Sequence, residues 1–194
     1  MSSVVAICNQ ALGLVGGSSI ISLDDETTEA NLCKTLYGPV RDSVLEAHNW
    51  TFALKWYSLP KLSSPPLSEF GNAFQLPSDV LRVVYVGVDM RSPAEDWRVE
   101  GDAIVTDANT VKCQVVHRVI DPAKYSPLFI QALAARLAAD FAIPLTKSRS
   151  LMETHYQVYV EKLKEAIRRD NMQGTPRRIR STWLRRARGG FIGH

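Results

Sequence analysis

The residues with the most distinctive chemistry lie at the C-terminal end of the chain. Residues 174–194 include six arginines but no lysine and no acid. Guanidinium groups form forked hydrogen bonds with carboxylates and phosphates. Aromatic and apolar side chains alternate with them, and aromatic and arginine side chains dominate the energy of many protein interfaces. The candidate interface residues are Arg177, Arg178, Ile179, Arg180, Trp183, Leu184, Arg185, Arg186, Arg188, Phe191 and Ile192.

The rest of the chain carries the opposite charge. The whole chain has 23 basic and 20 acidic residues and a formal net charge of +3. With the six arginines set aside, 17 basic and 20 acidic residues remain, a net charge of −3. An acidic body joined to a basic arm predicts a partner for the arm, either a nucleic acid or an acidic protein surface. Trp183 and Phe191 favour a protein partner, because a tail that stays in solvent would not need large aromatic side chains.

The familiar sequence signatures of enzymes are missing. There is no Gly-x-Ser-x-Gly elbow, no phosphate-binding loop of the Gly-x-x-x-x-Gly-Lys type and no His-Glu-x-x-His. The four histidines are scattered, and the three cysteines lie far apart, which indicates buried free thiols. The acid runs at 24–26 and 95–96 are typical of solvated loops. We therefore expect no catalytic, cofactor-binding or metal-binding residues.

We also expect neither a leader peptide nor a membrane segment. The N-terminus lacks a positively charged start before an apolar run, so it does not resemble a signal peptide. No apolar stretch is expected to approach the roughly 20 residues that span a bilayer. The sequence thus predicts a protein without membrane contact that stays in the cytoplasm of the cell that makes it.

Apolar spacing and capping residues indicate four helices. The pattern predicts helices at about 3–15, 29–48, 128–143 and 150–169. Gly16 ends the first, and Ser126 starts the third as an N-cap before a proline. Pro144 is expected to end the third helix, and Pro39 to kink the second. The third helix also carries a stripe of alanines, which would let another helix approach closely.

The segment between the second and third helices has a different pattern. Aromatic and β-branched residues in short runs predict strands at 51–59, 80–88, 97–100, 103–106 and 111–120. The run at 61–72 contains prolines, serines and a glycine and is typical of a surface loop. No helices separate these strands, so the sheet should be antiparallel.

Together these elements predict an α+β fold. We expect a four-helix bundle with an antiparallel β insertion between the second and third helices, plus an extended C-terminal arm. The bundle would comprise residues 1–50 and 122–173, the β insertion residues 51–121, and the arginine-rich arm residues 174–194.

Several short blocks occur in an order that points to a known family. They are ICNQALGLVG at 7–16 with IISLDD at 20–25, the helical block at 29–45, WTFA at 50–53 and FQLPSD at 74–79. An alanine-rich helix and a long charged helix follow. Over about residues 4–173 the chain resembles the head-to-tail adaptor proteins of short-tailed bacteriophages, also called tail tubular protein A or gatekeeper-ring proteins.

The resemblance implies a structural virion protein with no cofactor and no turnover. Such proteins form rings with themselves, typically dodecameric, that dock beneath the portal protein and carry the tail nozzle or tube. DNA passes through the channel of the ring without sequence-specific binding. By position alone, residues 177–192 correspond to the C-terminal extension that engages portal subunits. The resemblance thus implies a place in the neck of the virion, after assembly in the host cytoplasm.

Two other functions remain open at this point. The chain could be a nucleic-acid-binding module that uses the arm, and six arginines on the phosphates of duplex DNA would give a salt slope of about −5. The third hypothesis is an enzyme, such as a hydrolase that acts on a bacterial surface, for which the sequence offers no nucleophile or base.

Overall fold

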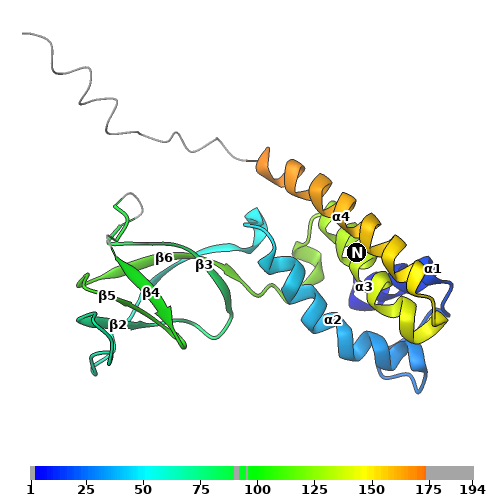
Figure 1. Ribbon diagram of the computed structural model, residues 1–194, viewed down its shortest axis with the longest axis horizontal. Helices are drawn as coiled ribbons and strands as arrows, with labels where there is room; N and C mark the ends of the chain where they lie inside the picture. Colours follow the sequence, from blue (N-terminus) through cyan, green and yellow to red (C-terminus); the bar gives the residue numbers. More distant parts are fainter. Residues whose placement is uncertain (1–2, 90–91, 95, 174–194) are drawn as a thin grey trace, which may run out of the picture.

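The computed structural model describes residues 3–89, 92–94 and 96–173. In these residues, four α-helices flank six β-strands, and all the strands lie between the second and third helices. The helices gather at one end of the molecule and the strands at the other (Figure 1). The chain is therefore of the α+β class. The predicted arm at 174–194 lies outside the described residues, and the predicted domain boundaries stay a prediction.

Helix α1 (Val4–Val15) has a cap at each end. Ser3 Oγ accepts a hydrogen bond from a backbone N–H of the first turn at 3.1 Å. Gly16 takes a left-handed φ of 74° at the C-terminal end, a conformation that glycine reaches without steric penalty. The loop that follows is held by Asn9, whose side chain donates to Ile20 O and accepts from Ile20 N, both at 2.8 Å.

Two prolines lie inside helices. Helix α2 (Thr28–Glu46), capped by Thr27, continues through Pro39. Helix α3 (Pro127–Thr146) continues through Pro144, so the expectation that this proline ends the helix is wrong. Proline removes one hydrogen bond of a helix. Pro144 lies in the last turn of α3, and the helix continues past it to Thr146.

Helix α3 combines length with an apolar composition. It is 20 residues long, with a mean hydropathy of 1.5 in its most apolar window, so its length and composition alone would allow it to cross a membrane. This corrects the expectation that no apolar stretch approaches that length. Within the described residues, 56% of the window is buried by the rest of the chain, and core helices of soluble proteins meet the same criterion.

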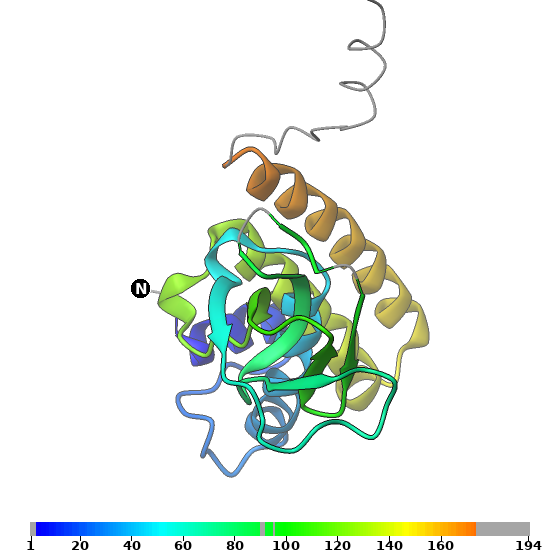
Figure 2. The ribbon, with the colours of Figure 1, turned by 90° about the vertical axis from the view of Figure 1, so that its left-hand side faces the viewer.

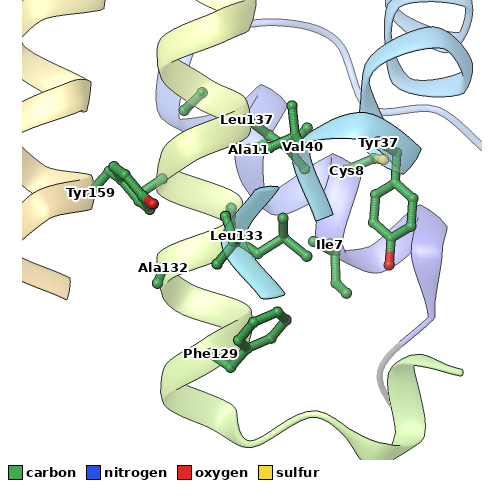
Figure 3. Close-up of a cluster of buried hydrophobic side chains, with 14 of the residues drawn as sticks. Ile7, Cys8, Ala11, Tyr37, Val40, Phe129, Ala132, Leu133, Leu137 and Tyr159 are labelled. Carbon is green, nitrogen blue, oxygen red and sulfur yellow. The ribbon is translucent and has the colours of Figure 1, made fainter. Parts of the chain in front are cut away.

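The helices do not form the four-helix bundle that the sequence predicted. Helix α3 packs extensively on α1, on α2 and on α4 (Arg149–Asn171), whereas α4 makes no extensive contact with α1 or α2. Leu133 and Leu137 of α3 point toward α1 and α2, and Ala132 lies on the opposite side, facing Tyr159 of α4 (Figure 3). Because α3 has buried apolar residues on two sides, it is the shared central element, and α4 covers only its outer side.

The strands form two antiparallel sheets of three. The first has the order β1 (Leu54–Leu59), β6 (Val111–His117), β3 (Val80–Gly87). The second has the order β2 (Asn72–Gln75), β5 (Ala103–Thr106), β4 (Trp97–Glu100). Figure 2 looks onto this end of the molecule, with the sheets in front of the helices. The antiparallel pairing follows the sequence pattern.

The two sheets enclose a small core of their own. Leu59, Val86, Val111, Cys113 and Val115 come from the first sheet, and Phe74 and Ile104 from the second. Gly101 has a φ of 61° in the predicted tight turn between β4 and β5. The short strand β2 was not predicted, because its first residue, Asn72, lies at the end of a run typical of loops.

Candidate functional site

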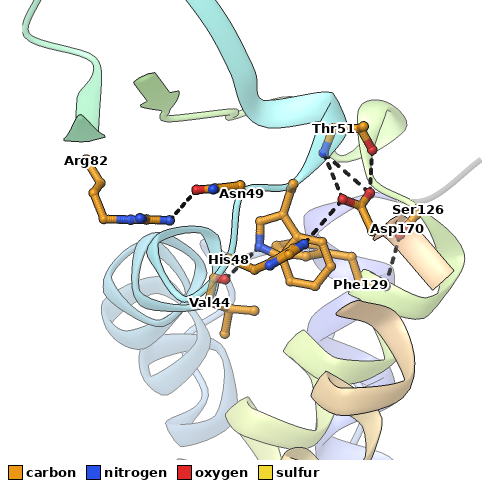
Figure 4. A network of polar contacts seen from close by, with 9 residues as sticks. Val44, His48, Asn49, Thr51, Arg82, Ser126, Phe129 and Asp170 are labelled. Atoms are coloured by element: carbon orange, nitrogen blue, oxygen red, sulfur yellow. Dashed lines mark hydrogen bonds and ion pairs between the residues drawn. The ribbon is translucent and has the colours of Figure 1, made fainter. Parts of the chain in front are cut away.

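The predicted interface residues of the arm lie outside the described residues, but the structure describes the point from which the arm continues. The described chain ends at Gln173, directly after α4. The last turns of α4 lie beside the junction between α2 and β1 (Figure 4). This junction therefore forms the described part of the candidate site.

Asp170 anchors the end of α4. Its side chain is only 5% exposed, and Oδ2 accepts a hydrogen bond from Thr51 N at 3.0 Å. The Thr51 hydroxyl donates a second hydrogen bond to Asp170 Oδ1. His48 Nε2 lies 3.5 Å from Oδ2, which is an electrostatic contact and not a hydrogen bond. The three side chains converge in Figure 4, and we call Asp170, Thr51 and His48 the α4 clamp.

Thr51 of the clamp directly follows Trp50, which is held firmly in the core. Trp50 is fully buried, and its Nε1 donates to Val44 O at 3.0 Å. Its ring meets the edge of Phe129, with centroids 5.1 Å apart, and stacks on Phe52 at 6.0 Å. Edge-to-face pairs of this kind add stability beyond their buried area. The end of α4 is thereby tied to the core between α2 and α3.

Burial sets the protonation of His48. Burial lowers the pKa of His48 below its ordinary value, and the negative charge of Asp170 opposes that shift without cancelling it. The positive charge of Arg82 lowers the pKa further. The neutral form of His48 is therefore favoured in the folded protein.

A second set of polar contacts joins the helices to the first sheet. Asp42 accepts hydrogen bonds from Arg41 Nε and Arg118 Nε, each at 2.8 Å. Arg82 of β3 donates to Asn49 Oδ1 at 2.6 Å and to the carbonyl of Glu46 at 3.2 Å. These contacts connect α2 to the end of β6 and to β3, so the strands have a defined position relative to the helices.

The surface around the end of α4 is basic. Arg168 and Arg169 are exposed in its last turn, and Met172 just beyond is 71% exposed. A cavity of about 680 Å³ lies between the start of α3 and this end of α4, lined among others by Pro127 and Leu128. The basic character of the arm thus begins on the described body.

Sequence reasoning did not single out the clamp residues. One signal was present: an acid in the last turn of a helix opposes the helix dipole, so Asp170 after Arg169 requires a compensating partner. The partner itself could not be inferred, since Thr51 lies 119 residues away in the sequence.

Asp24 and Asp25, in the acid run at 24–26, make local contacts. Asp24 pairs with Lys34 Nζ at 2.8 Å, and Asp25 accepts from the backbone N–H groups of Ile21 and Ser22. The described residues contain no group of three or more His, Cys, Asp or Glu that could hold a metal ion. The three cysteines are free and buried, as predicted.

Compared with known proteins, the chain matches no protein-family model and no curated sequence. The resemblance to phage adaptors therefore rests on the sequence blocks alone.

Proposed function

We propose that this chain is a structural virion protein, a subunit of the head-to-tail adaptor ring of a short-tailed bacteriophage. In this role it links the portal protein to the tail nozzle or tube, contacts further copies of itself and encloses part of the DNA channel. It needs no cofactor and no catalytic residue, and it acts in the neck of the particle. The observation that carries the proposal is the anchored end of α4, from which the arginine-rich and aromatic segment continues.

The residues that carry the resemblance have structural contacts, which supports a non-enzymatic role. Asn9, from the first block, holds the backbone of Ile20 through two hydrogen bonds of 2.8 Å. Trp50 and Thr51, from WTFA, provide the buried ring and the two hydrogen bonds to Asp170. Residues of these blocks thus shape the body of the protein, as expected for an assembly subunit.

The clamp gives the arm a fixed point of departure. A segment binds a partner more tightly when fewer degrees of freedom must be lost on binding. Since Asp170 lies only four residues before Gly174, the clamp fixes the chain close to where the arm begins. In a ring, every copy would present its arm from an equivalent position, and many weak contacts would act together.

The first test is removal of the arm. A chain that ends at Gln173 should keep the far-ultraviolet circular dichroism and thermal transition of the body but no longer co-sediment with DNA-filled particles that carry the portal. Co-sedimentation equal to that of the full chain would contradict the role of the arm.

A second variant separates protein binding from DNA binding in the full chain. Trp183→Ala with Phe191→Ala keeps all six arginines, so a nucleic-acid-binding arm should retain duplex affinity and a salt slope of about −5. A portal-binding arm should lose at least about tenfold in affinity for portal particles, because aromatic anchors contribute roughly 1–4 kcal/mol each. Portal binding equal to that of the wild-type chain, together with retained duplex affinity and salt slope, would argue for the alternative function.

A further inference from the structure

The two ends of the helical region differ in charge and carry exposed apolar side chains. Helix α4 has 23 residues, so about 33 Å separates its first residue from its last at the helical rise. Its beginning lies near the first turns of α2, where Met152, Leu32 and Leu36 line a common groove, and its end lies at the far side of the helical region (Figure 1). We call the region around the beginning of α4, with Leu36, Ile143 and Met152, the groove end. We call the region around its last turn, with Arg168 and Arg169, the basic end.

The groove end contains an open apolar groove of about 550 Å³. Helix α2 contributes Leu32 and Leu36, α3 contributes Ile143 and Pro144, and α4 contributes Met152. Ile143 is 50% exposed. Three helices thus frame a hollow whose walls are mostly aliphatic, a shape that suits a flexible apolar side chain.

An acidic loop borders this groove, and Asn31 lines both. The loop has a defined shape, because Asp25 accepts hydrogen bonds from two backbone N–H groups of the loop, at 2.9 and 3.0 Å. Lys34 neutralises Asp24. Glu26 and Glu29 make no ion pair within the described residues.

The loop also exposes an apolar side chain. Ile21 lies in it and is 92% exposed. The groove end therefore combines exposed apolar side chains with two carboxylates, Glu26 and Glu29, that make no ion pair within the described residues, which is a composition that suits a docking site.

The basic end offers the complementary features. Arg168 and Arg169 are exposed and make no ion pair within the described part of the chain. Met172, beside them, exposes most of its side chain. Methionine adapts to irregular apolar hollows, so the basic end carries both an anchor for the groove and charges for Glu26 and Glu29.

We propose that neighbouring copies of this chain contact each other through these two ends. Met172 of one copy enters the groove between Leu36 and Ile143 of the next copy, while Arg168 and Arg169 pair with Glu26 and Glu29. The occupant is a second copy, because the chain's own basic end lies a helix length away from its own groove. A contact between two different surfaces is heterologous and closes into a ring when the rotation permits. This interface rests on the proposed ring and names the surfaces that build it.

The test is a charge swap in the full chain. Arg168→Glu with Arg169→Glu should raise the protein concentration needed for ring formation at least about tenfold, since two surface pairs change from attraction to repulsion. Glu26→Lys with Glu29→Lys should do the same. The two pairs of substitutions combined in one chain should restore ring formation, because every interface then contains both reversed surfaces.

Matched controls test for non-specific effects. Lys61→Glu with Lys112→Glu reverses two exposed charges of the β region and should leave ring formation unchanged. Ile143→Asp should weaken ring formation, whereas Ile120→Asp, at a 68% exposed isoleucine that does not line the groove, should not. Folding of each variant is checked by its thermal transition.

Ring formation is measured by sedimentation velocity and electron microscopy, both for the free protein and on portal-bearing particles. Wild-type rings that persist when Arg168 and Arg169 are reversed, or swapped variants that fail to regain rings, would overturn the interface alone. A wild-type chain that forms no ring in either setting would instead overturn the proposed function.

Discussion

Asp170 explains how one residue can connect two distant parts of the chain. A carboxylate in the last turn of α4 opposes the helix dipole, and burial adds a desolvation penalty. The hydrogen bonds from Thr51 N and Thr51 Oγ1 compensate both effects. The same residue therefore terminates α4 in a fixed place and orients the chain that follows it.

Asp170→Ala should lower the free energy of unfolding by about 2 kcal/mol, because it leaves the N–H of Thr51 without its acceptor. Urea unfolding followed by circular dichroism measures this loss. Glu165→Ala, on the same helix, is the control: Glu165 is exposed and makes only a 3.5 Å contact with Lys162, so its loss should stay within about 0.5 kcal/mol. Equal effects of the two substitutions would contradict the clamp.

His48 should make the stability depend on pH. Its pKa in the folded protein lies below the ordinary value because of burial, so the neutral form is favoured by folding. The resulting stability is complete above the ordinary pKa and is lost as pH falls through that value toward the folded pKa.

The difference in unfolding free energy between wild type and His48→Gln should therefore shrink as pH falls from about 7 to about 5, across the ordinary histidine pKa. Urea titrations of both proteins at each pH provide the comparison. A difference that grows toward low pH would show instead that the ion pair with Asp170 outweighs burial.

At the scale of elements, α3 determines how the helices assemble. Bulky residues such as Phe129, Leu133 and Leu137 fill the core toward α1 and α2, and alanines on the other side admit α4. Small residues on a helix face permit close approach of a second helix, which becomes impossible if the face is enlarged. Helix α4 therefore depends mainly on α3 for its packing, and its end is held in addition by the hydrogen bonds between Thr51 and Asp170.

Ala132→Leu should destabilise the protein by about 1–3 kcal/mol, because Ala132 is fully buried where α3 meets α4 and the added atoms have no space. Gln131→Leu, at a half-buried neighbouring position, introduces the same side chain and should change the stability much less. Thermal unfolding of both variants measures the effect, and an unchanged Ala132→Leu protein would show that the α3–α4 contact is loose.

At the scale of the whole molecule, the helices and the first sheet share one core. Val116 of β6 and Val119 just after it are buried in the cluster that also contains Trp50 and Phe129. The hydrogen bonds of Asp42 with Arg41 and Arg118 reinforce this connection. The β region is therefore attached by packing as well as by chain connectivity.

The shared core predicts a single cooperative unfolding transition. Far-ultraviolet circular dichroism, dominated by the helices, and tryptophan fluorescence, which also reports Trp56 and Trp97 of the β region, should give the same midpoint in urea. Asp42→Ala should shift both midpoints together. Separate midpoints in the wild-type protein would show that the two regions unfold independently.

The sequence by itself determined the features that depend on near neighbours. Ser126 at the start of α3 and Gly16 after α1 act where their local chemistry predicts. The turn at Gly101 and the antiparallel pairing of β4 with β5 follow in the same way. Each depends on hydrogen bonds or backbone conformations within a few residues, so the local pattern contains enough information.

Only the tertiary structure decided which elements meet. Four amphipathic patterns are compatible with a bundle, yet the apolar surface of α3 on both sides places it between α4 and the other two helices. Thr51 and Asp170 contact each other across 119 residues of sequence, and no local pattern encodes such a pairing. The groove likewise exists only because α2, α3 and α4 bring distant residues to a common surface.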